Sequence, residues 1–169
     1  MAGTLLGLVL IAAAPSQPIR FEQFAVSKTF TGEAASPNLA SHPRARTYRT
    51  VLRTEAKSGA NFAGHFTVVR IGAGTGTILL AVVDALSGAV YFPKHPALIS
   101  WAGWWHDPYG PVYRIDSRLL IVYGRSGSED APYGISYFEW TGHDFKLLHF
   151  EPRDRGAPYG LRRPTPNVL

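Results

Sequence analysis

The 169-residue chain contains no cysteine and only one methionine. The missing thiols exclude disulfide bonds, thiol-based catalysis and cysteine metal sites, and they leave the redox compartment open. A membrane-spanning helix needs about 20 apolar residues, whereas the longest apolar run, at 5–14, has ten. The sequence therefore predicts no transmembrane span.

Two short glycine motifs approach known signatures without meeting them. In the dinucleotide-binding pattern Gly-x-Gly-x-x-Gly, the glycine that should follow Gly72 and Gly74 would fall at position 77, which is threonine. Residues 78–83 favour a strand and not the helix that this pattern needs. The polar loop 124–132 lacks the spacing of a hydrolase nucleophile elbow. We therefore expect no cofactor.

Composition and charge bound the class of protein. Hydrophobic residues make up 46% of the chain, and its length suits one domain with its own core. The formal net charge is +5, of which residues 153–169 carry +3, from four arginines and one aspartate. This proline-rich segment predicts a basic, disordered tail. No nucleic-acid motif accompanies the charge, so we expect no nucleic-acid partner.

Residues 1–18 have the features of a secretory signal peptide. The apolar run at 5–14 ends in three alanines, which offer a small-residue cleavage site before Pro15. This predicts a periplasmic or secreted protein with a single domain at 19–152. Because no Lys or Arg precedes the run, a buried N-terminal helix is the alternative, unless translation begins further upstream.

The middle of the chain, 61–93, predicts the centre of a β-meander. The run 78–83 contains no polar residue, so it predicts a strand buried on both faces, with sheet on one side and a helix or second sheet on the other. Gly72 and Gly74 would let the backbone turn between two strands.

One helix is predicted at 43–58, after a short edge strand at 21–32. Pro43 fits the first turn of the helix and Gly59 its end. Apolar residues recur at helical spacing and would face the sheet, while five Arg and Lys residues occupy the other face. That basic face is either a solvated surface, the commoner case, or a contact for an anionic partner.

These elements predict an α+β fold, mainly an antiparallel β-sheet with one N-terminal helix packed on it. Two strands at 133–140 and 145–150, around a turn at 141–144, complete the sheet as a hairpin.

The loop 93–111 carries several large rings between glycines and prolines. Such rings stack on sugars or partner side chains and are over-represented at interface hot spots. The alternative is a lid folded over the sheet. His106 and Asp107 lack metal-ligand spacing with His95, so no metal is predicted. The candidate partner-binding residues are Trp101, Trp104, Trp105, His106 and Tyr109.

Five other residues are predicted to have structural roles. His65 lies at the entrance of a buried strand, where an imidazole commonly bonds the backbone. The alternative is acid/base catalysis by His65 or His106 with a carboxylate from Asp84, Asp107 or Asp116. Two such groups must lie within hydrogen-bond reach of one substrate. The candidate structural residues are His65, Gly72, Gly74, Asp84 and Asp116.

Four phrases carry a family resemblance. They are RTYRTVLRTEAKSGANFAGHFTVVRIGAGTG, AVVDALSGAVYFP, RIDSRLLIVYGR and YFEWTGHDFKLL. Through them, the chain between Phe24 and Phe150 resembles a family of small exported bacterial β-rich proteins of unassigned activity. Family members carry tryptophan at the position of Ile71 and cysteines at those of Ala73 and Thr77, so the local disulfide that the resemblance implies is absent here.

Turn phrases at 84–88, 116–120 and 140–142 also resemble those of β-propeller blades, which implies propeller-like hairpins. Periplasmic lysozyme inhibitors and immunity proteins include folds of this kind, although this is an analogy of fold alone. The prediction is a non-enzymatic, exported binding or inhibitor-type protein of the bacterial cell envelope, with a protein or cell-wall glycan as partner and no catalytic residue. An envelope hydrolase using His65 or His106 is the alternative, and a structural accessory protein stays open.

Overall fold

The computed structural model describes residues 17–157. The helical elements in this range are η1 (Phe21–Phe24), η2 (Pro43–Arg46) and α1 (Arg49–Ala56), of which η1 and η2 are 3-10 helices. The strands are β1 (Phe66–Gly72), β2 (Thr77–Asp84), β3 (Val90–Tyr91), β4 (Leu98–Ser100), β5 (Gly110–Tyr113), β6 (Leu119–Ser126), β7 (Gly134–Trp140) and β8 (Phe145–Pro152).

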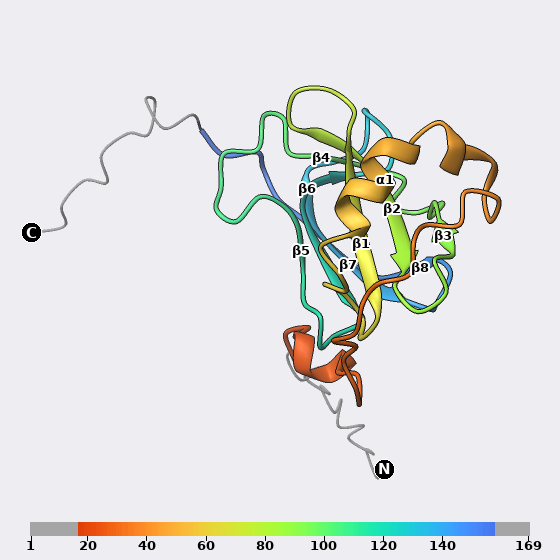
Figure 1. The fold of residues 1–169 in the computed structure, drawn as a ribbon. Helices are drawn as coiled ribbons and strands as arrows, with labels where there is room; N and C mark the ends of the chain where they lie inside the picture. The colour runs from red at the N-terminus through yellow and green to blue at the C-terminus, as the bar shows by residue number, and fades with distance from the viewer. Residues whose placement is uncertain (1–16, 158–169) are drawn as a thin grey trace, which may run out of the picture.

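The strands form one antiparallel sheet in the order β1-β2-β4-β6-β7-β8, with β3 beside β2 and β5 beside β6. Side chains from both ends of this order, including Phe66 of β1 and Phe145 of β8, meet in one buried cluster around Trp140. The sheet therefore curves until β1 and β2 face β6 and β7 across this core (Figure 1). The predicted α+β fold with a mainly antiparallel sheet is confirmed.

The strand β2 is buried on both faces, as its sequence predicts. Leu80 and Val82 point into the cluster around Trp140. Ala81, between them, packs on the other face with Leu52 of α1. Six consecutive residues of β2 are buried. The segment is a strand and not a helix, which excludes a dinucleotide-binding turn at the preceding glycines.

The predicted helix at 43–58 is interrupted, because η2 ends before α1 begins at Arg49. His42 accounts for the tight first turn. Its Nδ1 accepts a hydrogen bond from the backbone N–H of Arg44 at 3.1 Å, and its ring lies 4.8 Å from that of Phe92. These contacts hold the chain in a 3-10 turn that packs on the sheet, where helical periodicity alone predicts a continuous α-helix.

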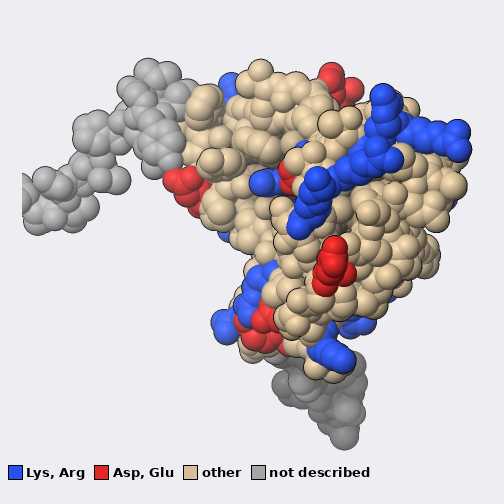
Figure 2. Space-filling view, viewed as in Figure 1, with Lys and Arg blue, Asp and Glu red and all other residues tan. Residues whose placement is uncertain are grey.

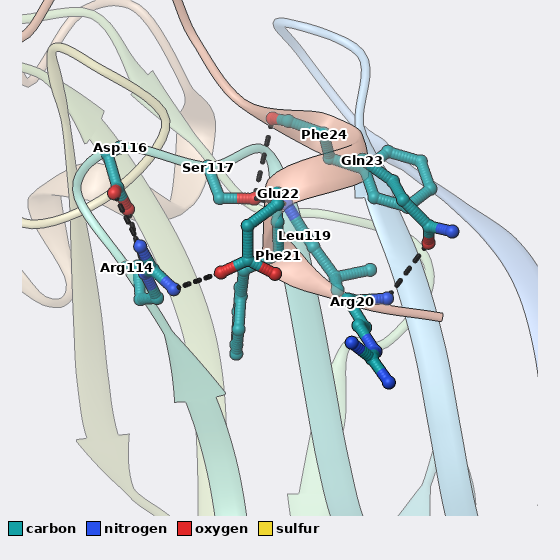
Figure 3. A network of polar contacts seen from close by, with 9 residues as sticks. All are labelled: Arg20, Phe21, Glu22, Gln23, Phe24, Arg114, Asp116, Ser117 and Leu119. Carbon is teal, nitrogen blue, oxygen red and sulfur yellow. Dashed lines mark hydrogen bonds and ion pairs between the residues drawn. The ribbon is translucent and has the colours of Figure 1, made fainter. Parts of the chain in front are cut away.

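The predicted edge strand at 21–32 is wrong. The chain instead forms η1 and then crosses the turn between β5 and β6 without entering the sheet as a strand (Figure 3). The buried hydroxyl of Ser117 donates to the carbonyl of Phe21 at 2.8 Å, and the amide of Val26 donates to the carbonyl of Asp116 at 2.9 Å. The alternation of apolar residues predicts a strand here. The segment instead forms its hydrogen bonds with the turn between β5 and β6.

One guanidinium links this N-terminal segment to the turn (Figure 3). Arg114 donates from Nε and Nη2 to the two carboxylate oxygens of Asp116, at 2.9 and 2.6 Å, and from Nη1 to Glu22 at 2.7 Å. The hydrogen bonds from Arg114 lower the pKa of Asp116. A backbone hydrogen bond, and then the bond from Arg114, lower the pKa of Glu22.

Substitution of Arg114 by glutamine is expected to lower the midpoint of thermal unfolding at neutral pH, and this effect should disappear in acid. Both partner carboxyl groups have lowered pKa values in the folded protein. Their contribution is therefore fully present above the unfolded values of 4.5 and 3.8 and is lost as the pH falls through the lowered values. Circular-dichroism melts between about pH 7 and about pH 2 measure it.

Lys28→Gln is the matched control, because Lys28 is an exposed cation of the same segment with no ion pair to a described carboxylate. It removes the same charge and should shift the midpoint little at any pH. A difference between the two variants that stays constant with pH would contradict the role given to Arg114.

The predicted signal peptide at 1–18 lies outside the described residues, apart from its last two positions. In the part of the chain that the structure describes, no helix has the length and apolarity needed to cross a bilayer. The periplasmic or secreted location stays a prediction.

Candidate binding surface around the aromatic loop

The aromatic loop, residues 101–109, joins β4 to β5. In Figure 1 it is the green segment beside the blue end of the described chain. At its start the amide of Trp101 donates to the carbonyl of Gly76 at 2.8 Å, which ties it to the β1–β2 hairpin. It ends at Gly110, whose φ is 70° and whose Cβ, if present, would lie 3.0 Å from the Trp101 ring. Glycine at 110 therefore lets the indole of Trp101 approach the backbone.

Trp104 forms the interior of this loop, although the sequence places it among the partner-binding residues. Only 7% of its surface is exposed, and its Nε1–H donates to the carbonyl of Pro108 at 3.0 Å. Its ring stacks on Tyr133 at 6.3 Å, and the Tyr133 hydroxyl donates to the carbonyl of Ala102 at 2.7 Å. The guanidinium of Arg125 lies 4.9 Å from the Tyr133 ring. Trp104 therefore holds the loop in place, with nearly all of its ring buried.

The expected disorder from residue 153 onward is wrong for residues 153–157, which pack against the loop. The amide of Trp105 donates to the carbonyl of Arg155 at 2.7 Å. Nε2–H of His106 is shared between the carbonyl and a carboxylate oxygen of Asp154, at 3.1 and 3.2 Å. The hydrogen bond from His106 lowers the pKa of Asp154. The remainder of that segment lies outside the described residues.

Two rings of the loop face solvent. Trp105 is 36% exposed and Tyr109 is 58% exposed, while the half-buried Trp101 lies with its ring 6.1 Å from that of Tyr109. They border a groove of about 390 Å³. Its other lining residues are Thr75, Gly76, Ala102, Gly103, Trp104, His106 and Asp107.

This arrangement suits stacking against a flat, weakly polar partner. An aromatic ring presents a large apolar face at a small cost in conformational entropy, and it contributes most where the protein already holds it in place. The hydrogen bonds from Trp101, Trp104 and Trp105 to backbone carbonyls supply that restraint.

His65 and Asp84, the other candidate catalytic pair, meet at the end of β2. Nε2 of His65 lies 4.0 Å from a carboxylate oxygen of Asp84, which is beyond hydrogen-bond distance. The carboxylate accepts instead from the amide of Leu86 at 2.8 Å and the hydroxyl of Ser87 at 2.7 Å. The His65 ring packs on Phe66 at 4.2 Å. Asp84 thus closes a turn, and this geometry leaves it poorly placed to orient the imidazole.

A second groove, of about 700 Å³, opens beside His65. Arg118 and Glu139 form an ion pair at 3.1 Å along it, and the lysines Lys28 and Lys146 also border it. Within residues 17–157, no three metal-ligating side chains gather at this or any other place.

The remaining predicted structural residues lie at turns. Gly74 has φ of 127° between β1 and β2, in a hairpin that the amide of Ala73 closes by donating to the carbonyl of Thr77 at 3.0 Å. Gly72 ends β1 and pairs with Ile78. Asp116 accepts from Arg114 as described above.

Several residues of the aromatic site escape sequence reasoning. Thr75 and Gly76 come from the β1–β2 turn, Tyr133 precedes β7, and Asp154 and Arg155 follow β8. No spacing in the sequence connects these positions with the loop, because the curvature of the sheet brings them together.

The chain matches no family model, no curated protein and no solved structure. The family resemblance in its sequence therefore stays a prediction, and the geometry above is the basis for assigning a role.

Proposed function

We propose that this chain is a non-enzymatic, exported binding protein of the bacterial cell envelope and that its aromatic loop holds a cell-wall glycan. The observation that carries the proposal is the pair of exposed rings, Trp105 and Tyr109, beside a groove of about 390 Å³. Both rings line the same groove, and exposed apolar side chains gathered at one place mark an interaction surface.

The chemistry of the groove supports a glycan over a protein partner. Sugar rings have apolar faces that stack on aromatic side chains, and their hydroxyl groups bond to polar groups at the edge of the same site. His106 and Asp107 supply such groups beside the rings. A protein partner would bury an apolar cluster of its own, and it is the alternative occupant that the experiment separates.

Trp105→Ala and Tyr109→Ala are each expected to weaken binding of soluble peptidoglycan fragments about 10- to 100-fold, because each removes a stacking ring of hot-spot type. Isothermal titration calorimetry measures the loss. Both side chains are far more exposed than the buried Trp104, so the thermal unfolding midpoint should fall less than it does when that buried ring is removed.

Leu86→Ala and Leu147→Ala are the matched controls, since these side chains are 56% and 52% exposed elsewhere on the molecule. They should leave glycan binding unchanged. If the wild type does not bind peptidoglycan fragments but binds an envelope protein through the same two rings, the partner is a protein and not a glycan. If glycan affinity falls equally in all four variants, the aromatic loop is not the binding site.

The alternative, an envelope hydrolase, has one favourable observation, the contact of His106 with Asp154 at 3.2 Å. A carboxylate that orients an imidazole is a recurrent element of acid/base catalysis. Here, however, the same imidazole N–H also bonds the Asp154 carbonyl and joins two chain segments, which favours a structural role. Release of reducing sugar ends from peptidoglycan by the wild type and not by His106→Gln would reverse this preference.

A further inference from the structure

The basic face of η2 and α1 has a charge and shape that the proposed glycan site does not use. We call its five cations the basic row. All five are exposed, and none forms an ion pair with a described carboxylate. The basic row consists of Arg44, Arg46, Arg49, Arg53 and Lys57.

Charge is concentrated in this segment to an unusual degree. Residues 43–58 hold five cations and one acid, Glu55, a net +4 within a chain of net +5. Since residues 153–169 carry +3, the rest of the chain sums to −2. The molecule therefore has a marked charge asymmetry, and this field would orient it toward an anionic surface before contact.

The cations form a band on one side of the molecule. Figure 2 shows neighbouring Lys and Arg side chains running across the position that α1 occupies in Figure 1. Within α1 and its C-cap, the spacing of four residues places Arg49, Arg53 and Lys57 on one helix face. At 1.5 Å per residue the stretch from Arg49 to Lys57 is about 12 Å long.

Local contacts hold part of the row in place. The guanidinium of Arg44 lies 4.8 Å from the ring of Phe92, and Arg49 donates from Nη1 to the carbonyl of Arg46 at 3.3 Å. Opposite them, Ala45 and Leu52 are buried against the sheet. The segment therefore presents its charged face outward and cannot turn its apolar face to a partner without unfolding.

The composition of the face selects among anionic partners. Its remaining exposed residues include three threonines, Thr47, Thr50 and Thr54. Such a face lacks the large apolar side chains that form the centre of a protein interface. The nearby rings Tyr48 and Phe92 are partly buried, so they do not offer the stacking platform of a single-strand nucleic-acid site. What remains is recognition by charge alone.

We propose that the basic row docks the protein on an anionic phospholipid bilayer, as a peripheral contact independent of the glycan site. The exposed cations of α1 and its C-cap share one helix face and can meet a plane of phosphate headgroups together, and each cation near such a surface adds to the attraction. Arginine predominates in the row, and its planar fork suits phosphate oxygens.

Flotation of the full chain with vesicles tests this proposal. The wild type should bind vesicles of phosphatidylcholine with about 30% phosphatidylglycerol and should not bind vesicles of pure phosphatidylcholine. Salt at about 0.5 M should release it, because screening weakens the attraction between the cations and the headgroups. The triple variant Arg46→Gln, Arg49→Gln, Arg53→Gln should lower the partition coefficient roughly 100-fold. Glu55→Gln, which removes the only acid of the segment, should raise it roughly fivefold.

Two control variants separate the row from net charge. Lys28→Gln, Lys94→Gln, Lys146→Gln removes three exposed lysines elsewhere, and a second triple variant neutralises the arginines at 155, 162 and 163. In both, the partition coefficient should fall less than about fivefold, because neither variant removes a cation of the basic row. Losses in either control equal to that of the row variant would overturn the proposal.

Other outcomes are equally decisive. Equal binding to both kinds of vesicle would overturn the proposal, as would capture of the wild type by duplex DNA without vesicle binding, because the partner would then be a polymer. If the row variant fails to fold, Glu55→Gln and the salt dependence of the wild type decide. Trp105→Ala should bind vesicles as the wild type does, so failure of the glycan proposal and failure of this one are told apart.

Discussion

Replacing Trp104 by alanine is expected to lower the free energy of unfolding by about 3 kcal/mol or more, in the range of buried Trp-to-Ala substitutions. The substitution leaves a cavity under the aromatic loop, removes the ring stacked on Tyr133 and leaves the carbonyl of Pro108 without its indole donor. Glycan binding should fall with it, because the exposed rings lose their support. Chemical denaturation followed by circular dichroism measures the stability, and calorimetry the binding.

Two comparisons isolate this effect. Trp105→Ala, at the next position but 36% exposed, should lower the free energy of unfolding less than Trp104→Ala does, while it weakens binding. Trp104→Phe keeps a ring in the cavity and should retain part of the stability. A Trp104→Ala variant as stable as the wild type would show that the loop does not need its buried ring.

Gly124→Ala is expected to destabilise the protein by about 3 kcal/mol or more, through backbone strain and overlap together. Gly124 has φ of 129° in β6, and a Cβ there would overlap the carbonyl oxygen of Ser100 in β4. It would also lie 3.2 Å from the Cα of Trp101. Because β4–β6 pairing joins the two halves of the sheet, the clash should displace the start of the aromatic loop. Thermal and chemical denaturation measure the effect.

Gly127→Ala provides the matched control for conformational strain without overlap. Gly127 has φ of 111°, but no atom lies within 4 Å of the position where its Cβ would be. It should lose only about 1–2 kcal/mol. Equal destabilisation by the two substitutions would show that the close approach of β4 to Gly124 has no energetic role.

Strand prediction succeeds where residues next to one another in sequence also pack in the same local environment. The run of β2 has no polar residue, and the structure buries it on both faces. The hairpin of β7 and β8 follows from alternating apolar residues around a turn, where the hydroxyl of Thr141 donates to the carbonyl of Asp144 at 2.8 Å. Such patterns report burial directly, because side chains of a strand alternate between its faces.

Prediction fails where the partner of a segment is distant in sequence. Where an edge strand is expected at 21–32, the chain begins with the 3-10 turn η1, which is joined to Arg114 and Ser117. Nothing local to that segment specifies a polar turn as its partner. The expected disorder after 153 likewise overlooks Asp154, which meets His106 almost 50 positions earlier. The composition of a segment shows how much apolar surface the segment could bury by itself. It does not show that the segment packs against another loop, as residues 153–157 do here.

Among the ring-bearing residues of the aromatic loop, sequence alone identifies a group and the tertiary structure divides it. Trp104 and Trp105 are adjacent and chemically identical, yet one is a buried support and the other a candidate contact. Trp104 stacks on Tyr133 and donates to the Pro108 carbonyl, whereas Trp105 keeps 36% of its surface exposed. The basic row is the opposite case. Helical spacing places Arg49, Arg53 and Lys57 on one face from the sequence by itself, since that periodicity is local. The absence of carboxylate partners within the described chain depends instead on how the sheet and the other segments fold around the row.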